Sequence, residues 1–228
     1  MKHDTILILD FGGQYCHLIG RRIREQGIYS EIVSHDITFR QIKALCTEFN
    51  VKGLILSGGP DSVYENDAPK FNPTILQSKL PILGLCYGHQ LIAQWAGAKV
   101  EPAPNKEYGI TIVTIEHPIG MLKSLNKREQ VWMSHGDTVF TLPKDYDVLA
   151  YSENTPVAAF ANESKKIYGL QWHPEVIHTR NGTQMLRNFL FGVCKCEPNW
   201  QIEDFIQKSG KEIRLVVNKN KAIVALSG

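Results

Sequence analysis

The chain has 228 residues, of which 43% are hydrophobic and 21% are charged, a composition typical of a globular protein with a substantial core. Its formal net charge is only +2 and it has no long run of Lys or Arg, which argues against a nucleic-acid partner. The apolar run Thr5–Leu9 is too short for a signal peptide or a membrane span. Five cysteines without a regular spacing indicate free thiols. We therefore expect a cytoplasmic protein without a membrane anchor.

The N-terminal half alternates between predicted strands and helices. Each apolar run of strand length is followed by a segment with helical spacing or a helix-capping pattern, as in Thr38–Gln41. This alternation predicts an α/β fold with an open, doubly wound, mostly parallel sheet of the flavodoxin-like type. The predicted strands are Thr5–Leu9, Glu31–Ser34, Gly53–Leu56 and Pro81–Leu85, and the helices start near Tyr15, Thr38, Phe71 and Gly88.

The pattern changes after Tyr108 to short strands separated by turns, which predicts antiparallel additions to the sheet. A helix is expected at Thr183–Val193. Near residue 197 the character changes again, and we predict a domain boundary between residues 1–196 and 197–228. The added strands are expected at Ile110–Ile115, Gln130–Met133, Val148–Tyr151, Val157–Ala161 and Ile167–Trp172, and the tail is expected to contain a linker at Glu197–Trp200, a helix at Ile202–Lys208 and a strand at Ala222–Leu226.

A cysteine lies between two glycines where a predicted strand meets a predicted helix. Gly84 and Gly88 each stand two residues from Cys86, the spacing of a nucleophile elbow, in which a tight turn exposes the central side chain. The N-terminus of the following helix favours a thiolate over a thiol. Because a lone cysteine is more often a small core residue, this interpretation needs a base and an oxyanion site elsewhere in the chain.

The best candidate base is His173, which ends a predicted strand and is followed two residues later by Glu175. If the extended geometry continues through Pro174, both side chains lie on one side of the strand. A carboxylate beside an imidazole fixes its tautomer and favours the imidazolium, while the second ring nitrogen takes the thiol proton.

Acyl transfer to a cysteine also needs two N–H donors where negative charge develops on the carbonyl oxygen. The backbone N–H of Tyr87, first in the predicted helix, is one candidate. Gly59 is the second, because the pair Gly58-Gly59 lets a loop on a neighbouring strand turn an amide toward the thiol. In doubly wound sheets ligands bind at the carboxyl ends of the strands, where this loop and Cys86 are both expected.

These motifs together resemble those of a known enzyme family. Gly84-Leu-Cys-Tyr-Gly-His-Gln90 with His173-Pro-Glu175 downstream is similar to the class I glutamine amidotransferases, which hydrolyse glutamine through a cysteine thioester and pass ammonia to a synthetase. Asp10-Phe-Gly-Gly-Gln-Tyr15 and Trp132-Met-Ser-His-Gly-Asp137 resemble the amidotransferase domain of the GMP synthases. The similarity extends from residue 5 to about residue 195.

The resemblance implies L-glutamine as the substrate and a role for each matching residue. Cys86 would be the nucleophile, His173 the base and Glu175 the residue that orients it. The amides of Gly59 and Tyr87 would bind the oxyanion. The glutamine head group would contact Gln90, Ser134, Gly136 and Asp137, with Asp137 suited to its ammonium group.

In that family an ATP pyrophosphatase domain follows the amidotransferase domain and uses ATP and magnesium to aminate xanthosine monophosphate (XMP) to GMP. The resemblance implies that residues 197–228 are a linker and the first helix and strand of this synthetase domain. No cofactor or metal is expected in this chain, and the resemblance is compatible with a homodimer of the full enzyme.

Two other interpretations remain open at this point. The first is another cysteine-elbow hydrolase, such as a γ-glutamyl hydrolase or a peptidase. The second is a nucleotide-binding module, because Ser57-Gly-Gly-Pro-Asp-Ser62 fits a phosphate-loop pattern. Such a loop should open a helix, whereas residues 63–73 contain two prolines and show no helical periodicity.

Overall fold

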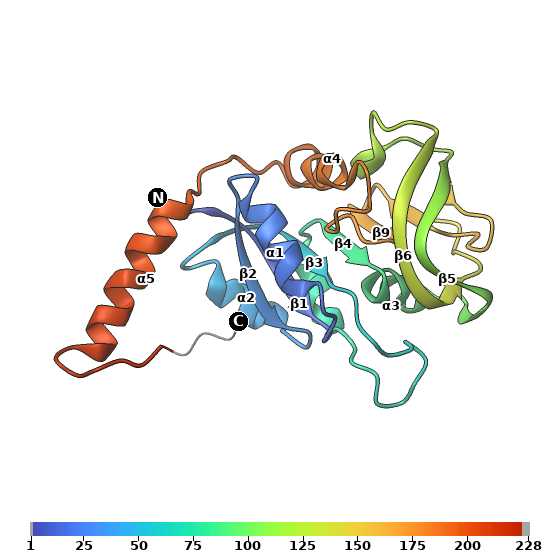
Figure 1. Ribbon diagram of the computed structural model, residues 1–228. Coiled ribbons are helices and arrows are strands. Elements are labelled where there is room, and N and C mark those ends of the chain that lie inside the picture. The colour runs from blue at the N-terminus through green and yellow to red at the C-terminus, as the bar shows by residue number, and fades with distance from the viewer. Residues whose placement is uncertain (1, 225–228) are drawn as a thin grey trace.

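The computed structural model describes residues 2–224 (Figure 1). Within them nine strands form one mixed sheet in the order β2-β1-β3-β4-β9-β8-β7-β5-β6. Neighbours from β2 to β9 pair in parallel, and neighbours from β9 to β6 pair antiparallel. The prediction of a doubly wound parallel sheet with antiparallel additions is confirmed. Four neighbouring strand pairs are parallel and four are antiparallel.

The first four strands and β9 form the parallel core, and the central strands β1 and β4 are buried on both faces. Ile6, Leu7, Ile8 and Leu9 in the central strand β1 are completely buried. A strand whose two faces are both covered is expected to read as one continuous apolar run, which is how these strands were predicted. The bounds are β1 Asp4–Asp10, β2 Tyr29–Ser34, β3 Asn50–Leu56 and β4 Ile82–Leu85.

Helices cover both faces of the parallel core, as Figure 1 shows. On one face lie α1 (Cys16–Arg24), α4 (Gly182–Arg187) and the π-helix η3 (Asn188–Val193), and the last two replace the single helix predicted at Thr183–Val193. On the other lie α2 (Phe39–Leu45), the 3₁₀-helix η1 (Pro73–Ser78) and α3 (Tyr87–Trp95). The predicted capping box at Thr38 and Gln41 is present.

The antiparallel strands differ from the sequence prediction most clearly in three places. β6 extends over Arg128–Val139 rather than Gln130–Met133, so it contains Ser134, Gly136 and Asp137. β5 begins at Val100 rather than Ile110, because a register shift between Pro102 and Glu107 accommodates a proline-containing stretch. β9 ends at Leu170 rather than Trp172, so His173 and Glu175 do not continue the strand. The bounds are β5 Val100–Ile115, β6 Arg128–Val139, β7 Asp147–Tyr151, β8 Ala159–Asn162 and β9 Ile167–Leu170, with a 3₁₀-helix η2 at Gly120–Leu122.

The tail begins by packing against the parallel core. The N–H of Trp200 donates to the Gly27 carbonyl at 3.0 Å, and the Trp200 side chain is buried. Helix α5 (Ile202–Val217) then projects from the sheet and is longer than the predicted Ile202–Lys208 (Figure 1). No strand forms over Ala222–Val224, and Ala225 and Leu226 lie outside the described residues. No helix in the described part of the chain is long and apolar enough to cross a membrane.

Candidate functional site

A cavity of about 650 Å³ lies at the carboxyl ends of the parallel strands, with β5 and β6 forming its opposite wall. Its position is the one expected for the ligand site of a doubly wound sheet. Eight of the nine predicted site residues line this cavity, namely Cys86, His173, Gly59, Tyr87, Gln90, Ser134, Gly136 and Asp137. The ninth, Glu175, is buried behind His173.

Cys86 stands on a strained turn between β4 and α3. Its φ of 51° and ψ of −103° are unusual for a residue with a side chain. The flanking glycines are required by close packing, because a Cβ atom on Gly84 would overlap the Gly88 carbonyl and one on Gly88 would overlap the Leu56 carbonyl. The N–H of Cys86 donates to the Leu170 carbonyl at 2.8 Å, which ties the turn to β9. The predicted nucleophile elbow is therefore present.

The Cys86 sulfur contacts two groups from the antiparallel half of the sheet. Its Sγ lies 3.6 Å from the Ser134 carbonyl oxygen, where a thiol donates. The Gln171 side-chain amide donates to Sγ at 3.7 Å. Gln171 was not among the residues that the sequence singled out, because nothing in its local pattern distinguishes it from a strand residue.

His173 and Glu175 are paired as predicted, but by a different geometry. The distance from His173 Nδ1 to Glu175 Oε1 is 2.7 Å, and both residues are buried. They lie in a turn after β9 rather than in an extended segment, and hydrogen bonds from the Thr179 hydroxyl to the His173 carbonyl (2.6 Å) and from Arg22 Nε to the Glu175 carbonyl (2.9 Å) hold that turn. The turn therefore brings the His173 and Glu175 side chains together, which the sequence analysis had expected of a continued strand.

His173 also lies next to Cys86. A Cβ atom built on Gly58 would stand 3.1 Å from His173 Cε1 and 3.7 Å from Cys86 Cβ, so both side chains flank this glycine. Burial lowers the pKa of His173, but the charges of Glu175 and Cys86 outweigh burial and hold the pKa well above its usual range. Because Nδ1 is taken by Glu175, Nε2 is the nitrogen left to exchange a proton with the thiol.

The loop after β3 carries the predicted oxyanion donor Gly59. The Ser57 hydroxyl accepts from the Phe11 N–H at 3.0 Å and donates to the Gly58 carbonyl at 2.9 Å, which fixes the loop. A Cβ atom on Gly59 would lie 2.9 Å from the Phe11 carbonyl oxygen and 3.1 Å from Tyr87 Cγ. Within residues 2–224 the backbone N–H groups of Gly59 and Tyr87 donate no hydrogen bond, so both are available to a ligand.

The same loop does not have the structure of a phosphate loop. No helix starts between Ser57 and Asn72, and the next helical element is η1 at Pro73. A phosphate loop presents its amides together with the N-terminus of a helix that follows directly. The nucleotide-binding interpretation is therefore disfavoured, because the helix that should follow the phosphate loop is absent from the described residues 63–72.

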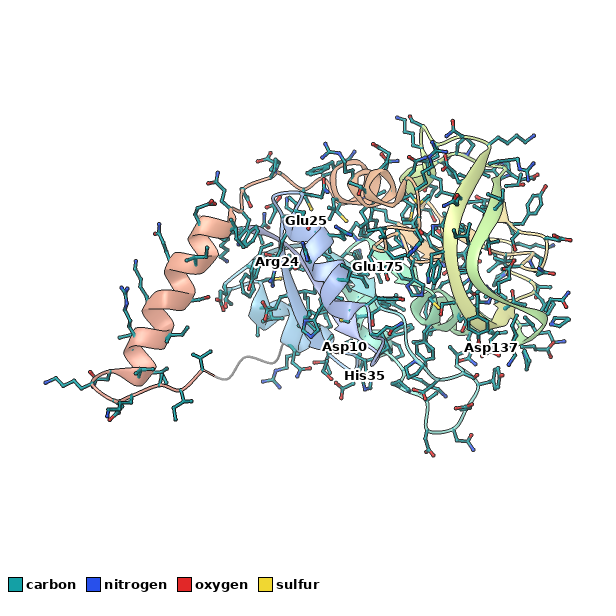
Figure 2. The ribbon with its side chains drawn as sticks, in the orientation of Figure 1. Asp10, Arg24, Glu25, His35, Asp137 and Glu175 are labelled. Atoms are coloured by element: carbon teal, nitrogen blue, oxygen red, sulfur yellow. The ribbon has the colours of Figure 1, made fainter. Side chains whose placement is uncertain are left out.

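The predicted head-group residues line the same cavity as Cys86, with Gln90 on α3 and Ser134, Gly136 and Asp137 on β6. The Asp137 carboxylate accepts hydrogen bonds from the hydroxyls of Ser62 and Tyr64, and Figure 2 shows Asp137 near one end of the β5–β6 pair. Gln90 Nε2 donates to the Asp137 carbonyl at 2.9 Å. Tyr64 was not predicted as a site residue, because it lies in a stretch without periodicity. Ser62 was predicted only as part of a possible phosphate loop.

Two more cavity residues, Lys106 and His135, were also missed. Among residues 2–224 no group of three or more His, Cys, Asp or Glu side chains is arranged to hold a metal ion. The reactive groups at this cavity are the Cys86 thiol, the His173–Glu175 pair and the backbone N–H groups of Gly59 and Tyr87.

Known proteins show the same fold and sequence pattern. The family described as "Glutamine amidotransferase class-I" matches residues 7–193. The chain is 50% identical over 228 residues to "GMP synthase [glutamine-hydrolyzing]" of Caldanaerobacter subterraneus subsp. tengcongensis, covering all of this chain and 44% of that protein. It is 47% identical over 227 residues to the protein of the same name from Bacillus cereus, of which it also covers 44%. The chain thus spans less than half the length of these relatives.

Solved structures agree with this grouping. A Thermoplasma acidophilum protein that is provisionally assigned to GMP synthase superposes with a TM-score of 0.76 at 32% identity, over 91% of this chain and 99% of that one. A glutamine amidotransferase from Thermotoga maritima superposes with a TM-score of 0.61 at 21% identity, over 95% of this chain and 94% of that one, and shows the shared fold. With the family pattern matched over residues 7–193 and this fold around the cavity, the chain belongs to the class I glutamine amidotransferases.

Proposed function

We propose that this chain is the glutamine-hydrolysing part of a GMP synthase. The observation that carries the proposal is the placement of Cys86, on a strained elbow, beside a buried His173 whose Nδ1 is 2.7 Å from Glu175. This is the arrangement in which an imidazole activates a thiol and a carboxylate orients the imidazole. The names of the relatives support glutamine as the amide that is cleaved.

In the first half of the reaction the Cys86 thiolate attacks the carboxamide carbon of L-glutamine. The amide oxygen becomes negative and accepts hydrogen bonds from the N–H groups of Gly59 and Tyr87. The His173 imidazolium then protonates the amide nitrogen, the C–N bond breaks and ammonia leaves. The products are free ammonia, a Cys86 thioester and a neutral His173.

In the second half water replaces the thiol. His173 removes a proton from water, and the oxygen attacks the thioester carbon while the same two N–H groups hold the second oxyanion. The C–S bond breaks, glutamate leaves, and the thiolate and imidazolium are restored. Glu175 keeps the His173 ring in one tautomer and orientation through both halves. Gln90, Ser134, Gly136 and Asp137 are proposed to hold the glutamine head group, with Asp137 facing its ammonium.

The proposal is tested by the products and by the choice of amide. We expect the chain to convert L-glutamine to equal amounts of glutamate and ammonia, and to leave γ-glutamyl dipeptides uncleaved. L-asparagine serves as the control, since it presents the same carboxamide on a side chain one methylene shorter. Faster cleavage of γ-glutamyl dipeptides than of glutamine would instead support a γ-glutamyl hydrolase.

We further propose that ammonia is used by a synthetase domain to which residues 197–228 lead, with ATP, magnesium and XMP as its ligands. Helix α5 supports this proposal because Ile206, Ile213 and Leu215 expose apolar surface that a second domain would cover. A reducing, cytoplasmic location is proposed because the reaction needs Cys86 as a free thiol.

The synthetase proposal predicts that residues 1–196 hydrolyse glutamine and that only the longer protein forms GMP. We expect a variant ending at residue 196 to hydrolyse glutamine but to form no GMP from XMP, ATP and ammonium. The longer protein should form GMP with either glutamine or ammonium as the nitrogen source. GMP formation by residues 1–196 alone, measured by chromatography of the nucleotides, would contradict the proposed boundary.

A further inference from the structure

A buried carboxylate–imidazole pair lies in the antiparallel part of the sheet, and neither residue has a role in the proposed reaction. Glu107 on β5 and His135 on β6 are register partners, and the distance from Glu107 Oε2 to His135 Nε2 is 3.3 Å. Glu107 is 6% exposed and His135 is 4% exposed. Burying a carboxylate and an imidazole destabilises a fold unless the pair is well hydrogen-bonded, so this pair requires a physical explanation.

Glu107 is held in its charged form by hydroxyl donors from a neighbouring loop. Thr155 Oγ1 donates to Oε2 at 2.6 Å, and Ser152 Oγ contacts the two carboxylate oxygens at 2.8 Å and 3.0 Å. Burial raises the pKa of Glu107, but the nearby His135 and the hydrogen bonds from Thr155 and Ser152 outweigh burial and lower the pKa to about 2. With these partners the Glu107 carboxylate stays negatively charged and is held in place next to His135.

The opposite nitrogen of His135 holds the backbone of the cavity wall. Nδ1 lies 2.8 Å from the carbonyl oxygen of Asp137, and a carbonyl can only accept, so Nδ1 carries a proton. The other nitrogen faces the Glu107 carboxylate, which is also an acceptor. The side chain of His89, the nearest titratable neighbour on α3, is neutral because burial and the nearby His135 lower its pKa to about 3.

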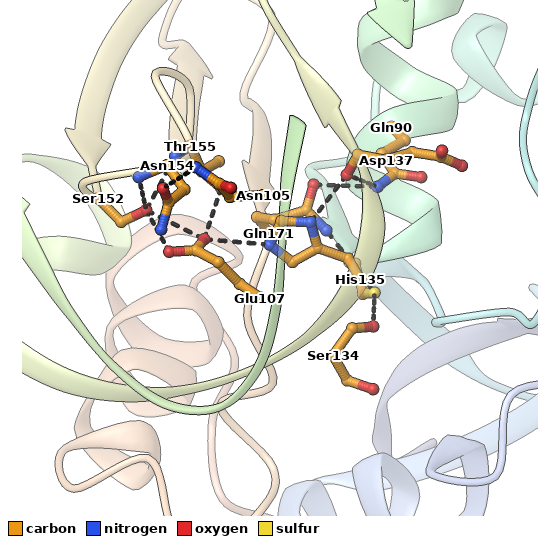
Figure 3. Close-up of polar contacts among 11 residues, drawn as sticks. Gln90, Asn105, Glu107, Ser134, His135, Asp137, Ser152, Asn154, Thr155 and Gln171 are labelled. Atoms are coloured by element: carbon orange, nitrogen blue, oxygen red, sulfur yellow. Dashed lines mark hydrogen bonds and ion pairs between the residues drawn. The ribbon is translucent and has the colours of Figure 1, made fainter. Parts of the chain in front are cut away.

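The Asp137 carbonyl is shared with a second donor that leads to the nucleophile. Gln90 Nε2 donates to it at 2.9 Å and to Gln171 Oε1 at 3.1 Å. Gln171 Nε2 in turn donates to Cys86 Sγ at 3.7 Å. Figure 3 shows these contacts as one connected set running from Ser152 and Thr155 through Glu107 and His135 to the segment of β6 that lines the cavity.

We propose that Glu107 and His135 are positioning residues for glutamine: they fix the Asp137 carbonyl, and with it the segment Ser134–Asp137, at the place where the head group binds opposite Cys86. The inference rests on the proposed function, since it assigns these residues to the glutamine site. Neither residue touches the reacting atoms. Their effect should therefore fall mainly on the capture of glutamine-like molecules and only weakly on the intrinsic reactivity of the thiol, which they reach through intervening residues.

Two electrophiles separate these effects. The rate of alkylation by a chloroketone analogue of glutamine depends on the head-group site and on the reactivity of the thiol. The rate of alkylation by iodoacetamide depends only on the thiol and its base. We expect Glu107→Gln and His135→Phe to lower the second-order rate of Cys86 alkylation by the glutamine analogue by about 10- to 100-fold. The rate with iodoacetamide should stay within about two-fold of wild type, a change far below the expected loss.

Two further variants act as rescue and as control. His135→Asn keeps an N–H donor near the position of Nδ1, so it should lose less capture of the analogue than His135→Phe. Glu129→Gln is the matched control, because Glu129 is also a buried carboxylate on β6 but bonds to Asn126 and Asn181 away from the cavity. It should behave as wild type with both electrophiles. The thermal midpoint of each variant confirms that it is folded.

The outcomes distinguish failure of this inference from failure of the proposed function. If the glutamine analogue does not label Cys86 in the wild-type chain, the proposed function is wrong. If the wild type is labelled and folded Glu107→Gln and His135→Phe are labelled at the same rate, the positioning role is wrong. An equal loss with both electrophiles would also overturn it, because the pair would then act on the thiol or on the whole fold.

Discussion

Replacing Cys86 with alanine is expected to abolish glutamine hydrolysis, with a loss of at least about 10⁴-fold in kcat, because the thioester route is removed entirely. The chloroketone analogue of glutamine should label wild-type protein on Cys86 and leave the variant unlabelled there. Peptide mapping by mass spectrometry locates the label, and ammonia release measures the activity. The fold should persist, since alanine keeps the Cβ atom and the backbone that Gly84 and Gly88 accommodate.

The chain contains its own reference thiol for this experiment. Cys46 is exposed at the end of α2, whereas Cys86 is largely buried at the cavity. Labelling that followed exposure alone would modify Cys46 first, and labelling that follows binding would modify Cys86 first. A Cys46→Ala variant should hydrolyse glutamine at the wild-type rate. Ammonia release that survives in Cys86→Ala would eliminate Cys86 as the nucleophile.

The second large effect is expected at His173 and, to a smaller degree, at Glu175. His173→Ala should lower kcat by about 10²- to 10⁴-fold, the usual contribution of a general acid–base group. Glu175→Gln should lower it less, because the amide still orients the ring. His178→Ala is the control, since His178 is exposed and stacks on Trp132 with ring centroids 4.6 Å apart. It should leave kcat unchanged.

The pH profile gives Glu175 a signature that a purely structural residue would lack. The Glu175 carboxylate raises the pKa of His173, so its removal should lower that pKa. The imidazolium that pairs with the thiolate is lost as pH rises through this pKa, and the alkaline limb of kcat/KM should therefore move to lower pH in Glu175→Gln. An alkaline limb at the wild-type position would show that Glu175 does not act on His173 electrostatically.

Local features of the sequence were sufficient to predict the parallel core and the glycine-flanked turn that carries Cys86. Strand β1 is an uninterrupted apolar run because both of its faces are buried, and the elbow at Cys86 is visible because two glycines must flank it. The pairing of His173 with Glu175 was predicted for an incomplete reason. Residues two apart can meet in an extended strand and also in a turn, and the structure uses a turn.

Features that depend on tertiary pairing could not be predicted in the same way. The hydrogen bond from Ser62 to Asp137 joins residues 75 positions apart, and no local pattern announces it. Glu107 and His135 did leave a trace, since each occupies an inward-facing position on a strand that also has buried apolar residues at inward positions, such as Val113 and Met133. A charged residue at such a position indicates a buried partner, but the partner follows only from the register of β5 against β6.

The place of β9 in the sheet has a consequence for synthesis on the ribosome. β9 inserts between β4 and β8, although β4 and β3 are already complete when Cys86 has been translated. Gln171 follows Cys86 by 85 residues, which corresponds to roughly 4 to 17 s of translation. If β1 to β4 pair during this interval, β4 presents an unpaired edge that another strand could occupy, and Cys86 still lacks its proposed base. The proposed nucleophile and base can therefore meet only after β9 has paired with β4.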